Sequence, residues 1–245
     1  MKTSNHLLRR LTAALLAAVL ALSIALPVFA SDDGDTIYIN SVSDLLSLAR
    51  SCAYDQWSVG KTVILQKDLS LEGMLWEPIP SFSGQFKGNG HTVSDLTITG
   101  QYSPAGLFGI VEEQGSIESL SVRGVVSVSD SADTTTGGIV GINHGTLISC
   151  QFTGVVTGDS EVGGIVGRNE SEGTIDHSTA RAIVTGKSST GGIAGYNLGA
   201  ITGCTNVGSI NTEYPEASLD TDGFTAKMVD YINNKMAAAA DDATN

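Results

Sequence analysis

The sequence is poor in aromatic, proline, cysteine and basic residues. In 245 residues it has 6% aromatics, 5 prolines and 3 cysteines, whereas glycine occurs 29 times. This composition is atypical of helical bundles and α/β enzymes, and it favours an all-β repeat protein with small side chains at regular tight turns. Lys and Arg number 13 against 26 Asp and Glu, a net charge of −13, which argues against binding to nucleic acid or an anionic membrane surface.

The first thirty residues have the features of a secretory signal peptide. Lys2, Arg9 and Arg10 precede an apolar stretch over residues 11–30 that ends at Ala30. This order predicts export with cleavage after Ala30, and the rest of the chain has no second long apolar run to insert into a membrane. The alternative is an uncleaved anchor helix, since about twenty apolar residues just span a bilayer. We therefore expect a secreted or cell-surface protein.

A glycine-rich motif recurs along the middle of the chain. Gly-Gly-Ile-Val-Gly-x-Asn starts at Gly137 and Gly163, and a version with Ala in place of Val starts at Gly191. A diverged copy starts at Ala105, so that successive starts are 32, 26 and 28 residues apart. Repetition at this period is typical of solenoids, propellers and arrays. The spacing predicts repeats over residues 105–136, 137–162, 163–190 and 191–213.

Each copy also continues in register beyond the motif. Apolar and polar residues alternate within each half-copy, which is the period of a strand buried on one face. No copy can bury that face alone, so successive copies must stack. We predict a right-handed parallel β-helix (solenoid) with one coil per copy. The predicted core columns are Leu107/Ile139/Ile165/Ile193, Ile117/Leu147/Ile175/Ile201 and Val126/Val156/Val184/Ile210.

The last residue of the motif forms a further column of Asn143, Asn169 and Asn197. We interpret this column as structural, because Asn tolerates left-handed turns at coil corners and stacked Asn side chains can hydrogen-bond as a ladder. The alternative is a ligand-binding row. Asn169 also begins an Asn-Glu-Ser glycosylation pattern. We interpret this match as a coincidence, because Asn169 has a place in the ladder.

The motif, followed by Gly-Thr-Leu or Gly-Thr-Ile, resembles the GLUG repeat of bacterial surface proteins. The stretch over residues 82–93 is similar to the coil that commonly precedes those repeats, so the resemblance covers roughly residues 60–213. It implies a β-helical, exported, cell-surface protein. Such repeats occur in adhesin-like proteins and in non-catalytic regions of secreted peptidases, and the resemblance transfers no active site.

Both ends of the solenoid need a cap, because terminal coils expose unpaired edges. Residues 31–60 supply a short strand and a helix that starts at Ser41, and the solenoid follows over residues 61–213. Residues 214–245 contain a second predicted helix, from Asp222 to about Ala240, and then a frayed tail. This helix either caps the last coil or stands out as an insertion. The chain has no wall-sorting signal, so a longer protein that continues beyond Asn245 is a further alternative.

The cysteines and histidines show no metal-binding spacing. Cys150 and Cys204 fall in one column but two coils apart, about 9.6 Å, whereas a disulfide permits a Cα separation of at most about 7 Å. Cys52 lies in the predicted capping helix, far from both. We therefore predict three free, buried thiols.

Some β-helices act on glycans, and they need clustered carboxylates beside a basic residue on one outer face. No copy breaks the repeat to assemble such a cluster, and the acidic loops lack the dense Asp-x-Asp run that calcium sites use. We therefore interpret the acidic residues as solvated loops and predict no catalytic, metal or cofactor site. The acids concerned are Asp130, Asp133, Asp159, Glu161, Glu170, Glu172 and Asp176, with Arg123 and Arg181 as outward basic residues.

Taken together, these features predict a non-catalytic exported repeat protein that serves in adhesion or spaces another module. The expected partner is an unidentified protein or glycan on a cell surface, and the expected state is a monomer. The alternatives are the accessory region of a secreted peptidase and a glycan-active β-helix enzyme.

Overall fold

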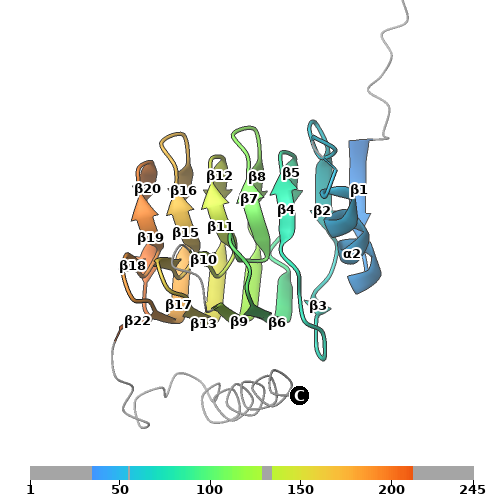
Figure 1. Ribbon diagram of the computed structural model, residues 1–245. Coiled ribbons are helices and arrows are strands. Elements are labelled where there is room, and N and C mark those ends of the chain that lie inside the picture. Colours follow the sequence, from blue (N-terminus) through green and yellow to red (C-terminus); the bar gives the residue numbers. More distant parts are fainter. Residues whose placement is uncertain (1–34, 55, 129–133, 212–245) are drawn as a thin grey trace, which may run out of the picture. The chain divides into compact units, whose positions relative to one another are not determined.

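The computed structural model describes residues 35–54, 56–128 and 134–211 of the chain. Within these ranges the chain winds into a parallel β-solenoid, which confirms the predicted fold class (Figure 1). Each full coil passes in turn through four short sheets, which we name D, C, A and B. The predicted signal peptide (1–30) and the predicted C-terminal helix and tail (214–245) lie outside the described residues.

Sheets A and B contain the most strands. In sheet A the neighbours are, in order, β1 (Thr36–Ile39), β2 (Thr62–Leu65), β5 (Gln85–Lys87), β8 (Ser116–Glu118), β12 (Thr146–Ile148), β16 (Thr174–Asp176) and β20 (Ala200–Thr202). In sheet B they are β3 (Leu69–Ser70), β6 (Thr92–Gly100), β9 (Ser121–Val128), β13 (Gln151–Thr157), β17 (Thr179–Thr185) and β21 (Thr205–Asn206), with β22 (Ser209–Ile210) also paired to β17.

Sheets C and D complete each coil. Sheet C has the order β4 (Ile79–Phe82), β7 (Phe108–Val111), β11 (Val140–Asn143), β15 (Val166–Asn169) and β19 (Ala194–Asn197). Sheet D has the order β10 (Thr135–Gly137), β14 (Glu161–Gly163) and β18 (Thr190–Gly191). The two sheets approach closely: a Cβ atom at Gly167 of β15 would lie 2.6 Å from the backbone nitrogen of Thr136 in β10. This contact requires glycine in the motif.

Strand pairing stacks equivalent residues of successive coils. The backbone of Ile165 accepts a hydrogen bond from Ile139 and donates one to Ile193, so the first predicted column follows the axis. The other two columns are paired residue by residue. These pairs are Ile117–Leu147, Leu147–Ile175, Ile175–Ile201, Val126–Val156, Val156–Val184 and Val184–Ile210.

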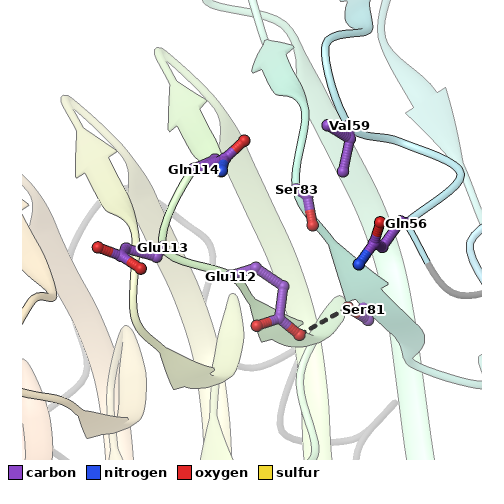
Figure 2. A pocket seen from close by; sticks show the side chains of 7 residues that line it. All are labelled: Gln56, Val59, Ser81, Ser83, Glu112, Glu113 and Gln114. Atoms are coloured by element: carbon purple, nitrogen blue, oxygen red, sulfur yellow. Dashed lines mark hydrogen bonds between the residues drawn. The ribbon is translucent and has the colours of Figure 1, made fainter.

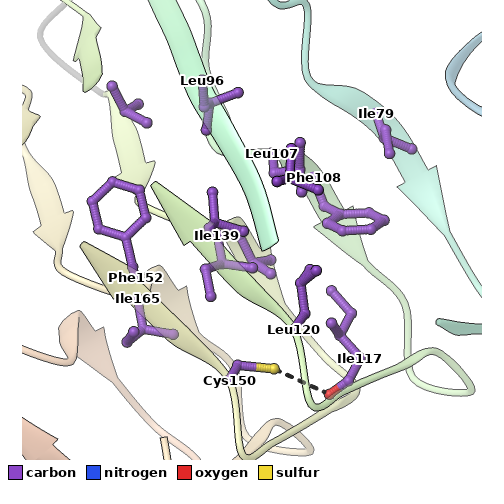
Figure 3. Packing of buried hydrophobic residues seen from close by; sticks show 14 of the residues in the cluster. Ile79, Leu96, Leu107, Phe108, Ile117, Leu120, Ile139, Cys150, Phe152 and Ile165 are labelled. Carbon is purple, nitrogen blue, oxygen red and sulfur yellow. Dashed lines mark hydrogen bonds between the residues drawn. The ribbon is translucent and has the colours of Figure 1, made fainter. Parts of the chain in front are cut away.

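The stacked columns form one continuous apolar core. Figure 3 shows Ile139, Phe152 and Ile165 packed inside the coils, and each of these side chains is 0% exposed. Toward the first coils the core becomes aromatic: the ring of Phe108 lies 5.4 Å from the rings of both Phe82 and Phe86. Tilted and edge-on aromatic contacts of this kind add to the stabilisation from burial.

The first coil is covered by the helix α2 (Val42–Ser51), which packs beside β1 and β4. Ser41 is its N-cap and accepts a hydrogen bond from the backbone of Asp44, as the sequence predicts. The Asp44 carboxylate accepts in turn from the backbone of Asn40. Leu45 and Leu48 are buried beneath the helix. Because β1 pairs in register with β2, the parallel stack starts at Thr36 rather than at residue 61.

The left-handed corner positions differ from the prediction. In the coils from β8 onward, the residues with positive φ between sheets A and B form the column Ser119, Ser149, His177 and Gly203, with φ of 51°, 53°, 45° and 62°, and the coil before them has Asn89 and Gly90 there. None of the three column asparagines is among the positive-φ residues; they end strands of sheet C with ordinary backbone geometry. The assignment of these asparagines to left-handed corners was therefore wrong.

The last described coil is less buried than predicted. Ile201 and Ile210 were assigned to the core, yet they are 38% and 36% exposed, and Ile193 is only partly buried. The reason is geometric, since β19 and β20 are the outermost described strands of sheets C and A. Their inner faces therefore have a neighbouring coil on one side only.

Candidate functional site

A polar cavity of about 320 Å³ lies where the loop after α2 meets sheet C. Figure 2 shows the carboxylate of Glu112 directed toward Ser81, whose Oγ donates a 2.7 Å hydrogen bond to it, while Glu113 points away from Ser81. Hydroxyl, amide and carboxylate groups line the cavity, with no cationic side chain among them. The lining residues are Gln56, Val59, Ser81, Ser83, Glu112, Glu113 and Gln114.

The cavity depends on the length of the turn between β7 and β8. Four residues, 112–115, join β7 to β8, whereas only two, 144–145, join β11 to β12 in the next coil. The longer turn holds Glu112 and Gln114 against Ser83 and the loop after α2. None of the seven lining residues was predicted from the sequence. The signal that could have found them is the spacing between the motif and its second half, which differs between copies.

The predicted acidic residues do not converge on one site. Asp159 pairs with Lys187 at 2.6 Å, and Asp176 lies 2.8 Å from His177. Arg123 and Arg181 are exposed on sheet B with Thr153 between them. Asp130 and Asp133 lie outside the described residues. In the ranges that the structure describes, no group of three or more His, Cys, Asp or Glu side chains is placed to hold a metal ion.

Two of the predicted acids do meet, on the outer side of sheet C. Glu161 accepts two hydrogen bonds from Arg168, one of them 2.7 Å long at Nε, and Glu170 lies 3.4 Å from the same guanidinium. The hydrogen bonds that Arg168 donates to Glu161 raise the pKa of Arg168, so its charge is permanent. The ring of Tyr196 lies 4.9 Å from this guanidinium. Both carboxylates pair with a single guanidinium, which leaves the cluster with an excess of negative charge, and this mutual pairing favours a structural role over proton transfer.

The asparagine column lies inside the solenoid. Asn143 donates to the Oδ1 of Asn169 at 2.7 Å, and Asn169 donates to the Oδ1 of Asn197 at 2.8 Å. Each amide nitrogen also donates to the backbone carbonyl of the glycine that closes its turn. Asn143 and Asn169 are 0% exposed, whereas Asn197 in the last described coil is exposed. A ligand on the outer surface therefore cannot reach Asn143 or Asn169, and the buried, bonded amide of Asn169 is not accessible for glycosylation.

All three cysteines are free thiols, but Cys204 in the last coil is only partly buried. Burial raises the pKa of Cys150 to about 12 and that of Cys52 to about 11.

We therefore expect Cys52 and Cys150 to resist iodoacetamide at pH 8 in the native protein and to react fully in denaturant. At a pKa of about 12, only about one thiol in ten thousand is ionised at that pH, and the thiolate is the nucleophile. Peptide mass spectrometry measures the labelling of each residue. Rapid native labelling of Cys150 would contradict its place in the core.

The geometry defines the class of the molecule: a parallel β-solenoid with a helical cap on its first coil. Residues 158–185, from the end of β13 to the end of β17, match the model of the family described as "The GLUG motif". The chain therefore carries a GLUG motif within a parallel β-solenoid, which confirms the resemblance seen in the sequence.

Two curated relatives match part of the chain. Halomucin of Haloquadratum walsbyi is 30% identical over 155 residues, which is 58% of this chain but 2% of halomucin. A "Putative Gly-rich membrane protein" of Evansella cellulosilytica is 29% identical over 137 residues, which is 40% of this chain and 16% of that protein. The chain thus spans a small part of the length of both relatives.

One solved structure aligns with part of the chain. The crystal structure of a putative immunoglobulin A1 protease from Bacteroides ovatus aligns with a TM-score of 0.46 and 15% identity. The alignment covers 75% of this chain and 79% of that one. Among the helices in the described ranges, none has the length and hydropathy needed to cross a bilayer.

Proposed function

We propose that this protein is a non-catalytic, exported β-helical module that binds a glycan or protein at a cell surface, or holds another module there. In this proposal the chain leaves the cytoplasm by its signal peptide, is cleaved after Ala30, and acts as a monomer without a cofactor. The charged start and apolar stretch of residues 1–30 support export. One matched relative, which carries the word membrane in its name, supports a place at the cell boundary.

The observation that carries the binding role is the cavity beside Ser81 and Glu112. Its volume of about 320 Å³ lies within the range of small-molecule sites. Its hydroxyl and amide groups can exchange hydrogen bonds with sugar hydroxyls, and its carboxylates accept them. The two glutamates and the lack of a lining cation disfavour an anionic ligand. A neutral or basic glycan therefore fits the cavity best.

The test is binding of the purified chain without residues 1–30 to an array of neutral and amino-sugar oligosaccharides, followed by titration of the strongest ligand. We expect the double variant Glu112→Ala/Gln114→Ala to weaken binding at least about tenfold, because a loss of 1.4 kcal/mol corresponds to that factor. The matched control is Glu170→Ala/Glu172→Ala, which changes the same two positions of the equivalent four-residue turn at 170–173. Equal loss in both double variants would refute the cavity as the binding site.

The rival interpretation is a glycan-active enzyme. The bonding of Glu161 and Glu170 to one arginine supports the non-catalytic proposal, since these carboxylates are engaged with a side chain of the protein itself. The same oligosaccharides, incubated with the protein and analysed for new reducing ends, distinguish the two. Turnover that is lost in Asp159→Ala or Asp176→Ala would replace our proposal with the enzyme.

A further inference from the structure

The last described coil presents an apolar end to the solenoid. Leu198 is 52% exposed, Val207 is 56% exposed, and Ile201 and Ile210 are 38% and 36% exposed. We name these four residues the end face. One coil further in, Ile175 and Val184 occupy the columns of Ile201 and Ile210 and are 0% exposed. Burial in the core thus stops abruptly at this coil.

The composition of this coil is that of an interior coil. Residues 188–211 contain no Asp, Glu, Lys, Arg, His or Pro. Exposed sheet edges are normally protected by such residues, because charge and proline block pairing with other chains. Residues 135–158, which also lack Asp, Glu, Lys and Arg, lie between the neighbouring coils on both sides. The end face therefore lacks the residues that protect a free edge and needs a cover.

The opposite end of the solenoid shows what such a cover looks like. There α2 lies over the first coil, with Leu45 and Leu48 turned inward and at most 2% exposed. The helix meets the core through side chains spaced three residues apart, and it follows directly on β1, the first strand of sheet A. At this end an amphipathic helix, together with the strand before it and the loop after it, closes the coil.

We infer that residues 222–240 of this chain form a helix whose apolar stripe covers the end face. Thirty-four residues come after Asn211, more than the shortest repeat of 26, but they contain no Gly-Gly-Ile motif with which to add a coil. Their apolar residues Phe224, Met228, Tyr231 and Ile232 have the spacing i, i+4, i+7, i+8 of one helix face. Residues 212–221 provide a connection of up to about 33 Å, ample to return to the coil.

Cys204 reports on this cover. It lies in the last coil, partly buried, in the column of the fully buried Cys150. A helix over the end face would shield its thiol from solvent reagents, whereas loss of the helix would leave it reachable. Cys150 serves as the internal control, because it is buried between coils whether or not the end is covered.

The experiment measures alkylation of Cys204 by iodoacetamide at pH 8 in the chain without residues 1–30. We expect the double variant Met228→Asp/Ile232→Asp, which charges the apolar stripe, to react at least about tenfold faster than the unmodified chain. The matched control Asn233→Asp/Ala237→Asp places the same two charges on the opposite helix face. It should react within about twofold of the unmodified chain, with Cys150 inert in all three proteins.

Equal rates in the unmodified chain and the stripe variant would overturn the inference. Protection that weakens on dilution, with a molar mass of two chains by light scattering, would assign the cover to a second copy and also overturn it. Hydrogen–deuterium exchange of the unmodified chain gives a readout that needs no variant. The inference requires slow exchange in residues 224–236 and in β20, and fast exchange in residues 224–236 would exclude it.

Discussion

The variant Ile165→Asp is expected to lose most or all of its folding stability. Ile165 is 0% exposed and lies between Ile139 and Ile193 in the stack, so the new carboxylate would have apolar neighbours above and below. Burial of an unpaired charge, added to the loss of the isoleucine, costs more than about 4 kcal/mol. Native domains have only about 5–15 kcal/mol of net stability, so this cost is most or all of the free energy of unfolding. Urea denaturation followed by far-UV circular dichroism measures the change.

The control for this variant places the same acidic residue on the outer side of sheet B. Thr153 is half-buried on the outside of sheet B, between Arg123 and Arg181 in the neighbouring strands. Thr153→Asp places its charge in water beside two basic residues, and we expect a change within about 0.5 kcal/mol. Equal destabilisation by Ile165→Asp and Thr153→Asp would mean that the inner and outer faces are wrongly assigned.

The core columns could be predicted because the repeat itself encodes them. A spacing of two between apolar positions fixes which side chains share a face, and the repeated motif fixes which residues are equivalent between coils. Leu147, for example, is flanked by Ile117 and Ile175 as its spacing requires. In a parallel stack, register is set by the equivalence of copies, so no further information was needed.

The left-handed corner, the cavity and the exposure of the last coil could not be predicted, because the repeat does not encode them. The left-handed corner falls at Ser149 and His177, which differ in chemistry and therefore show no column in the sequence. The cavity depends on how a four-residue turn meets the loop after α2, two segments more than fifty residues apart. The exposure of Ile201 follows from its place in the last described coil, which equivalence between copies cannot show.

The second large effect is expected in the asparagine ladder, at Asn169→Asp. The amide of Asn169 accepts one hydrogen bond from Asn143 and donates two, to Asn197 Oδ1 at 2.8 Å and to the carbonyl of Gly173 at 3.1 Å. Even removal of the amide, in Asn169→Ala, is expected to cost about 3 kcal/mol, at about 1 kcal/mol for each bond. An ionised aspartate keeps the acceptor but turns a negative oxygen toward two other acceptors in a buried site, so the cost at pH 7 is larger still.

The direction of the pH dependence distinguishes the energetic cost of the buried charge from the cost of the lost hydrogen bonds. Burial raises the pKa of the new carboxyl in the folded state above its unfolded value of about 3.9. Folding therefore favours the protonated form, which can again donate one hydrogen bond. The stability deficit of Asn169→Asp relative to the unmodified chain should be smallest below about pH 4 and should grow as the pH rises toward the folded-state pKa.

Asn89→Asp is the matched control for this titration. Asn89 is exposed and donates a single hydrogen bond to the carbonyl of Leu65. We expect that variant to lose about 1 kcal/mol or less, with little further change between about pH 4 and 7. Chemical denaturation of the unmodified chain and both variants at each pH gives the comparison. A deficit for Asn169→Asp that stays constant with pH would show that its carboxylate reaches water, and the ladder would then lie on the surface rather than inside the coils.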